Sequence, residues 1–134
     1  MPRLTALRVT ALERLAADLR FAPRARVVAI VRAAETLAPT IDPDDVVDEA
    51  GLVRALTAYQ PDLDDPAAIP GDALLADLSA LAERLSEAAR LDESVLPSAL
   101  TADDLAARWN VSVKTVSRLR REGLIAWRVR TSAG

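Results

Sequence analysis

The side chains best suited to chemistry are cations and hydroxyls gathered on one predicted helix near the C-terminus. They lie on the face opposite Val116 and Leu119, and such a face suits a DNA groove where phosphates and base edges are both in reach. We therefore predict double-stranded DNA as the partner. The candidate contact residues on the helix are Ser112, Val113, Lys114, Ser117, Arg118 and Arg121. Further positive charge comes from Arg120, Arg128 and Arg130.

The roles of these residues follow from their chemistry. Lys114, Arg118 and Arg121 are expected to contact bases or phosphates, since lysine and arginine side chains present cationic donors to the acceptor atoms of DNA. Ser112 and Ser117 are expected to contact the backbone or base edges. The remaining arginines would add non-specific attraction.

Two helices and a tight turn must position this face, and the sequence from Leu100 to Arg130 predicts a helix-turn-helix. Thr101 is a good N-cap for a helix over about 102–109, in which Leu105, Ala106 and Trp109 share the buried face. Asn110 tolerates a positive φ and marks the turn. Ser112 then caps the second helix, and Gly123 ends it.

Residues 124–130 have the alternation of a half-buried strand, with Trp127 and Val129 on one face and Arg128 and Arg130 on the other. This pattern predicts the first strand of a wing. A wing needs a second strand to satisfy its backbone groups, and residues 131–134 look like the start of the turn. We therefore expect the sequence to be a piece of a longer protein.

Composition favours a mainly α-helical fold: a helical bundle followed by the helix-turn-helix with a partial β wing. Hydrophobic residues make up 51% of the chain but aromatic residues only 3%, so alanine, leucine and valine must build the core. The chain holds no cysteine and no histidine and no glycine-rich phosphate loop, and we expect neither catalysis nor a cofactor. No apolar run is long enough to span a membrane and no signal peptide is present, which predicts a cytoplasmic protein.

An acidic cluster, DPDDVVDEAG, begins at Asp42 and raises the question of a metal site. Its spacing does not follow the EF-hand loop, and Asp42 followed by Pro43 is typical of a helix start. We therefore interpret the cluster as capping and expect no metal.

Charge is segregated along the chain. Residues 1–40 hold seven arginines against three acids, and residues 101–134 hold seven cations against three acids. Residues 41–100 hold three arginines against fourteen acids. An acidic middle repels DNA, so DNA contacts belong to the C-terminal part. The basic N-terminal surface is interpreted as solvated, with a nucleic-acid contact as the alternative.

Apolar periodicity predicts helices over 3–20, from Pro23 to about Ala38, and from Asp42 to about Tyr59. Residues 60–70 hold three prolines and are a loop and a candidate boundary, which divides the chain into 1–60, 61–98 and 99–134. Asp72 is expected to cap a helix that runs to about Arg90. This helix carries a seam that packs on another helix of this chain or of another subunit, which leaves the oligomeric state open. The seam consists of Leu74, Leu78, Leu81, Leu85 and Ala88.

Two resemblances extend this interpretation. The stretch LTADDLAARWNVSVKTVSRLRREGLI resembles the winged helix-turn-helix of the MerR and phage-excisionase type, which implies that the helix from Val113 to Glu122 enters the major groove. Together with DLSALAERLSEAARL, it also resembles the helical region that precedes the promoter-recognition regions in some large bacterial sigma-70-family factors. The second resemblance runs from about Phe21 to Arg130. It implies a DNA-binding regulatory fragment of an initiation factor, with RNA polymerase as a further partner.

A rival hypothesis assigns the helices up to Arg90 to protein docking, with the helix-turn-helix as a scaffold. The acidic middle fits this hypothesis, because it suits a basic surface on a polymerase or masks the cations of the helix-turn-helix itself. Salt-dependent DNA binding by residues 96–134 distinguishes the two hypotheses.

Overall fold

The computed structural model describes residues 7–59, 62–63, 65–92, 94 and 100–129. These residues form six α-helices, a short 3-10 helix and a two-stranded sheet, so the predicted mainly helical class is confirmed. Arg130, one of the predicted DNA contacts, lies outside the described residues.

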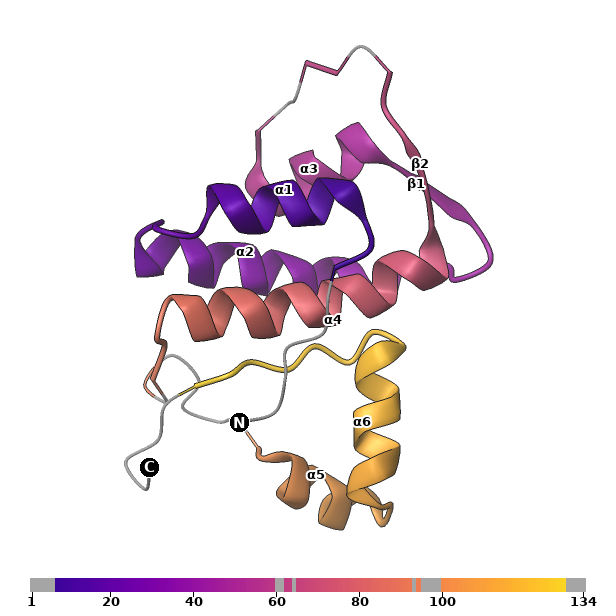
Figure 1. Ribbon diagram of the computed structural model, residues 1–134. Coiled ribbons are helices and arrows are strands. Elements are labelled where there is room, and N and C mark those ends of the chain that lie inside the picture. Colours follow the sequence, from indigo (N-terminus) through magenta and orange to yellow (C-terminus); the bar gives the residue numbers. More distant parts are fainter. Residues whose placement is uncertain (1–6, 60–61, 64, 93, 95–99, 130–134) are drawn as a thin grey trace.

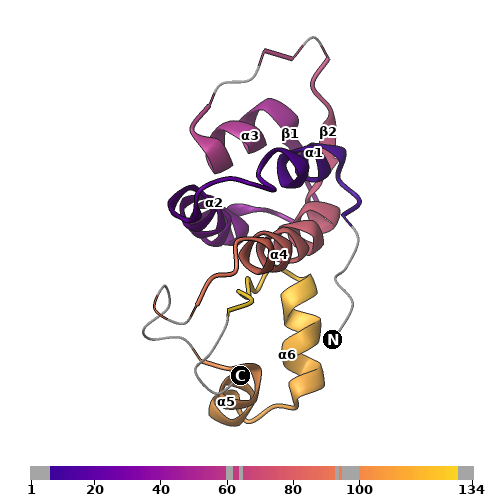
Figure 2. The ribbon, with the colours of Figure 1, turned by 60° about the vertical axis from the view of Figure 1, so that its left-hand side comes forward.

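Helix α4 (Gly71–Ala88) is the centre of the structure. Helices α1 (Thr10–Asp18) and α2 (Arg24–Leu37) pack on one side of it, and α6 (Val113–Arg121) packs on the other (Figures 1 and 2). The four leucines of the predicted seam are almost fully buried, whereas Ala88 is exposed. The seam therefore finds its partners within this chain.

The start of α1 differs from the predicted helix over 3–20. In the described part, residues 7–9 are not helical and the helix begins at Thr10. The Asp77 carboxylate on α4 accepts hydrogen bonds from the backbone N–H groups of Arg8 at 2.7 Å and Val9 at 2.5 Å. A distant side chain thus anchors the two residues that lead into α1, which has no side-chain N-cap of its own. The predicted break at Pro23 is confirmed, and α2 follows it directly.

The predicted helix from Asp42 is wrong in its first part. Residues Val46–Asp48 form strand β1, which pairs antiparallel with β2 (Ala68–Pro70), so that Val47 lies opposite Ile69. Helix α3 (Glu49–Thr57) begins only after Asp48, whose carboxylate accepts from the Gly51 N–H at 3.3 Å. Asp42 instead stabilises a turn by accepting from the Asp44 N–H at 2.9 Å.

A 3-10 turn, η1 (Ala38–Thr40), follows α2 and leads the chain towards β1. The predicted loop over 60–70 is wrong in its last three residues, which form β2 and pair with β1. Residues from α1, α2, α3 and α4 share one apolar core. Among the described residues, no helix is both long enough and apolar enough to cross a membrane.

Candidate nucleic-acid interface

The first helix of the predicted helix-turn-helix is α5 (Ala102–Trp109), and its start is a reciprocal capping box. Thr101 Oγ1 accepts from the Asp104 N–H at 3.0 Å, and Asp104 Oδ2 accepts from the Thr101 N–H at 3.4 Å. Asn110 follows with φ 55° and ψ 48°, in the left-handed region. The predicted cap and the predicted turn residue are both confirmed.

Helix α6 begins with Ser112, whose Oγ accepts from the Thr115 N–H at 3.1 Å. Its inner face carries Val116, which is 2% exposed and packs together with the buried Ala106 of α5. Gly123 has φ 116° and lets the chain leave the helix, with the Leu124 N–H donating to the Leu119 carbonyl at 3.0 Å. The caps of both helices and the turn residue between them therefore agree with the sequence prediction.

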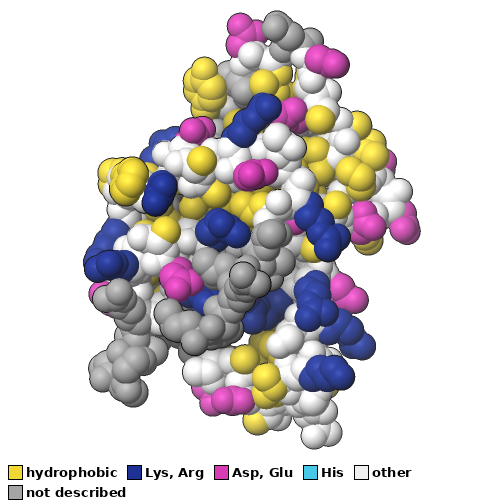
Figure 3. Space-filling model, viewed as in Figure 1, with side chains coloured by type: hydrophobic (Ala, Val, Ile, Leu, Met, Phe, Trp, Pro, Cys, Tyr) yellow, Lys and Arg dark blue, Asp and Glu magenta, His cyan; other side chains and the backbone are white. Residues whose placement is uncertain are grey.

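The outer face of α6 is cationic. Lys114, Arg118 and Arg121 are exposed, and their i, i+4, i+7 spacing places them in one row along the helix. Figure 3 shows Lys and Arg side chains along the outer side of α6. Ser112 and Val113 are also exposed at the start of the helix, while Ser117 is half-buried. The structure thus brings six of the nine predicted contact residues onto one helix face.

Arg120 lies elsewhere on the helix, because it follows the buried Val116 by four residues and shares its face. Its guanidinium contacts the carboxylate of Glu83 on α4, a residue that is 8% exposed. Burial lowers the pKa of Arg120, and the nearby Arg128 lowers this pKa further. The spacing from Val116 is a signal by which the sequence alone separates Arg120 from the outer row.

Arg128 is also engaged with α4. Its guanidinium contacts Glu83 at 3.3 Å and Glu87 at 3.2 Å. Two acidic side chains of the middle segment therefore pair with two of the C-terminal cations, while the outer row of α6 stays exposed. The acidic middle masks part of the positive charge near α6, and it does so within the chain.

The segment over 124–129 is not the predicted wing strand, since its described residues form no strand. It runs extended beside α4 (Figure 1), and Ser86 Oγ accepts from the Arg128 N–H at 2.8 Å. The Leu124 carbonyl accepts from Ser79 Oγ at 3.5 Å. The alternating apolar residues do pack on the core, but they pack against helices and not against a second strand. The residues packed on the core are Ile125, Trp127 and Val129.

Trp127 connects this segment to helix α2. Its indole N–H donates to the Glu35 carboxylate on α2, and the Arg32 guanidinium lies 5.6 Å from the centre of its ring. This contact joins the last described segment to α2, so the C-terminal part of the chain is held against the other helices through both α4 and α2.

Trp109 differs from its prediction. It was expected on the buried face of α5, but it is 46% exposed. Helix α5 ends at this residue and the chain reverses at Asn110, so Trp109 lies at the edge of the unit, whereas Ala106, one turn earlier, is buried. Leu100, Val111 and Val113 are large apolar residues with similar exposure in the same unit.

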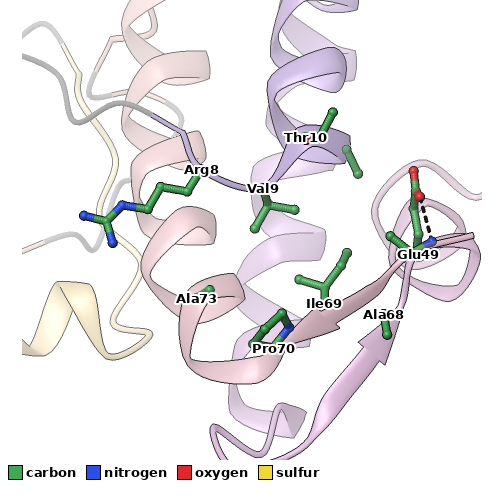
Figure 4. A pocket seen from close by; sticks show the side chains of 10 residues that line it. Arg8, Val9, Thr10, Glu49, Ala68, Ile69, Pro70 and Ala73 are labelled. Carbon is green, nitrogen blue, oxygen red and sulfur yellow. Dashed lines mark hydrogen bonds between the residues drawn. The ribbon is translucent and has the colours of Figure 1, made fainter.

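Two cavities lie away from this face. One, of about 210 Å³, is formed by the start of α1, by β2 and by the start of α4 (Figure 4). Its ionisable side chains are Arg8, which points away from Glu49, and Glu49, which already accepts from the Ala67 N–H at 3.0 Å. The other, of about 500 Å³, lies between α1 and α4. The described residues contain no group of three acidic side chains placed to hold a metal ion.

Neither protein-family models, nor curated proteins, nor solved structures give a match to this chain.

Proposed function

We propose that the α5–α6 unit binds double-stranded DNA, with α6 as the helix that enters the major groove. The observation that carries this proposal is the division of α6 into two faces. One face carries the buried Val116 and contacts α4 through Arg120, and the other presents Lys114, Arg118 and Arg121 to solvent. A row of exposed cations on a helix that is fixed from behind is the arrangement that positions side chains against phosphates and base edges.

The residues divide into contact and positioning roles in this proposal. Lys114, Arg118 and Arg121 contact phosphates or the acceptor atoms of guanine, and Ser117 lies beside them. Arg120 and Arg128 hold α6 and the following segment on α4 through Glu83. Arg130 remains a proposed backbone contact.

The regulatory part of the proposal rests on the resemblance to sigma-70-family factors. The chain then acts in the cytoplasm as a DNA-binding regulatory module of bacterial transcription initiation, with RNA polymerase as a second partner. The overall charge of −3 does not oppose DNA binding, because the local field around α6 decides the approach of a phosphate backbone.

Salt-dependent binding of the full chain to labelled duplex DNA tests the proposal. Three exposed cations predict that the logarithm of affinity falls against the logarithm of salt concentration with a slope of about −3. Arg118→Ala should make the slope shallower by about one. Arg26→Ala is the matched control, because Arg26 is an exposed arginine on α2 and should leave the slope unchanged. Absence of duplex binding at low salt, or an equal effect of both substitutions, rejects the proposal.

A protein-docking module is the second candidate function, and the exposed apolar side chains of the α5 region favour it. Trp109 and Leu100 are each 46% exposed, and exposed apolar groups of this size often mark a protein contact. Binding of the full chain to bacterial RNA polymerase, measured for wild type and Trp109→Ser, tests it. A measurable affinity that Trp109→Ser weakens, while duplex DNA binding is absent, favours docking over DNA recognition.

A further inference from the structure

An exposed arginine near the start of the described chain is held at a fixed place on α4. The backbone N–H of Arg8 donates to the carboxylate of Asp77 at 2.7 Å, and Asp77 is 3% exposed. Arg8 itself is exposed, and no acidic side chain of the described residues forms an ion pair with it. The fold therefore fixes the backbone of Arg8 and leaves its guanidinium accessible to a ligand.

The anchor of Arg8 lies at the same level of α4 as the end of α6. Leu75 lies beside Gly123, where an added Cβ would be 2.9 Å from the leucine Cδ2 atom. Asp77 is two residues from Leu75, and two residues of an α-helix span about 3 Å along its axis. A helix with its side chains is about 10–12 Å across, so the backbone of Arg8 and the end of α6 are separated by about the width of α4.

The side chain of Arg8 points to the side of α4 on which α6 lies. Figure 4 shows that it extends away from Glu49 and across α4, towards the yellow ribbon of the C-terminal part. In Figure 3, Lys and Arg side chains follow one another from the outer side of α6 up to the level of α4. The positive surface of α6 therefore continues beyond the α5–α6 unit.

DNA of the B form presents phosphates at a matching separation. Its major groove is about 12 Å wide, and a phosphate backbone runs along each edge of it. A helix that lies in the groove is thus flanked by phosphates at about the distance between Arg8 and the end of α6. A guanidinium suits such a phosphate, because it carries several N–H donors in a planar fork.

We infer that Arg8 contacts a phosphate of the DNA backbone beside the groove that α6 enters. This inference rests on the proposed DNA binding, and it extends the interface from the α5–α6 unit to the segment before α1. A phosphate contact fixes the orientation of a protein on the duplex but does not read the sequence. Arg8 would therefore orient α6 in the groove, while the cations of α6 itself reach the bases.

Binding of the full chain to labelled duplex DNA at several salt concentrations tests the inference. A fourth phosphate contact should steepen the wild-type slope of the logarithm of affinity against the logarithm of salt from about −3 to about −4. Arg8→Ala should return the slope to about −3 and weaken binding to all duplex sequences alike. Arg8→Lys keeps the charge and should keep a slope close to that of the wild type.

Arg14→Ala is the matched control. Arg14 is an exposed arginine on α1, which packs on the side of α4 opposite to α6, so this variant should keep the wild-type slope. Alanine at position 8 retains the backbone N–H that Asp77 accepts, so the fold should be preserved. Circular dichroism of all variants checks this.

Ethylation interference locates the contact, because it removes the charge of one phosphate at a time. Wild type and Arg14→Ala should be sensitive to ethylation of a phosphate that Arg8→Ala tolerates. If wild type binds duplex DNA but Arg8→Ala keeps its slope and its sensitive phosphates, the inference about Arg8 is overturned and binding through α6 stands. Equal effects of Arg8→Ala and Arg14→Ala also overturn it. Failure of wild type to bind any duplex at low salt overturns both proposals.

Discussion

The carboxylate of Glu83 on α4 contacts the guanidinium of Arg120 on α6, and the same carboxylate lies 3.3 Å from the guanidinium of Arg128. One buried carboxylate therefore pairs with two guanidinium groups that are close enough to repel each other. This contact fixes α6 on the bundle and turns the outer row of cations to solvent.

Glu83→Ala should lower the free energy of unfolding by about 2–3 kcal/mol, because it leaves the partly buried Arg120 without this acceptor and leaves Arg128 with Glu87 alone. Glu87→Ala is the matched control. Glu87 contacts only Arg128 among the described ion pairs and is more exposed, so its loss should cost about 0.5–1 kcal/mol. Urea denaturation measures both. Equal losses in the two variants would contradict the central role of Glu83.

Asp77→Ala should cost about 2–3 kcal/mol, since two backbone N–H groups at the start of α1 lose a charged acceptor in a buried site. Asp77→Asn keeps one acceptor oxygen and should cost less. Thermal unfolding followed by circular dichroism compares the two variants. An alanine variant as stable as the wild type would mean that these two hydrogen bonds do not hold the segment before α1 in place.

Gly71→Ala should destabilise the chain by about 2–3 kcal/mol, because the new Cβ would lie 2.0 Å from the backbone carbonyl oxygen of Asp42. Gly51→Ala tests the same change in open space. No atom lies within 4 Å of a Cβ at Gly51, and alanine favours a helix over glycine, so this variant should gain about 0.5 kcal/mol. Urea denaturation should show opposite signs, and a loss at both positions would contradict this prediction.

Asn110→Gly should be tolerated, whereas Asn110→Val should cost about 1–2 kcal/mol, because a branched side chain is strained at φ 55°. Thermal melts of the two variants measure the difference. A valine variant no less stable than the glycine variant would show that the turn relaxes to another conformation.

Local signals in the sequence predicted the α5–α6 unit well. Thr101, Asn110 and Ser112 each act on residues within a few positions, and the structure confirms all three. The helix class and the burial of the leucine seam followed in the same way from periodicity, whereas periodicity left open whether the seam packs within this chain. These features depend on neighbours along the chain, which a single sequence displays.

Features that depend on distant partners were not predictable in this way. The alternation from Leu124 to Val129 identifies an extended segment with one apolar face, but it does not tell a partner strand from α4. Strand β1 has three residues, too few to show a period of two. Asp77 looks like an ordinary helix residue until α1 is placed beside it. The position of Arg120 could be predicted from the sequence, because its spacing from Val116 places it on the inner face of α6.

The contact between Trp127 and Glu35 also bears on the order in which the chain folds. It joins residues 92 positions apart, whereas the capping and turn contacts of the α5–α6 unit span only a few residues. Closing so long a loop costs entropy before any contact repays it, and contacts of high sequence separation form slowly. We expect the α5–α6 hairpin to form early on local contacts. Its attachment to α4 and α2 would then be a late step, and tryptophan fluorescence in stopped-flow refolding of Trp109→Phe, which keeps Trp127, would report it.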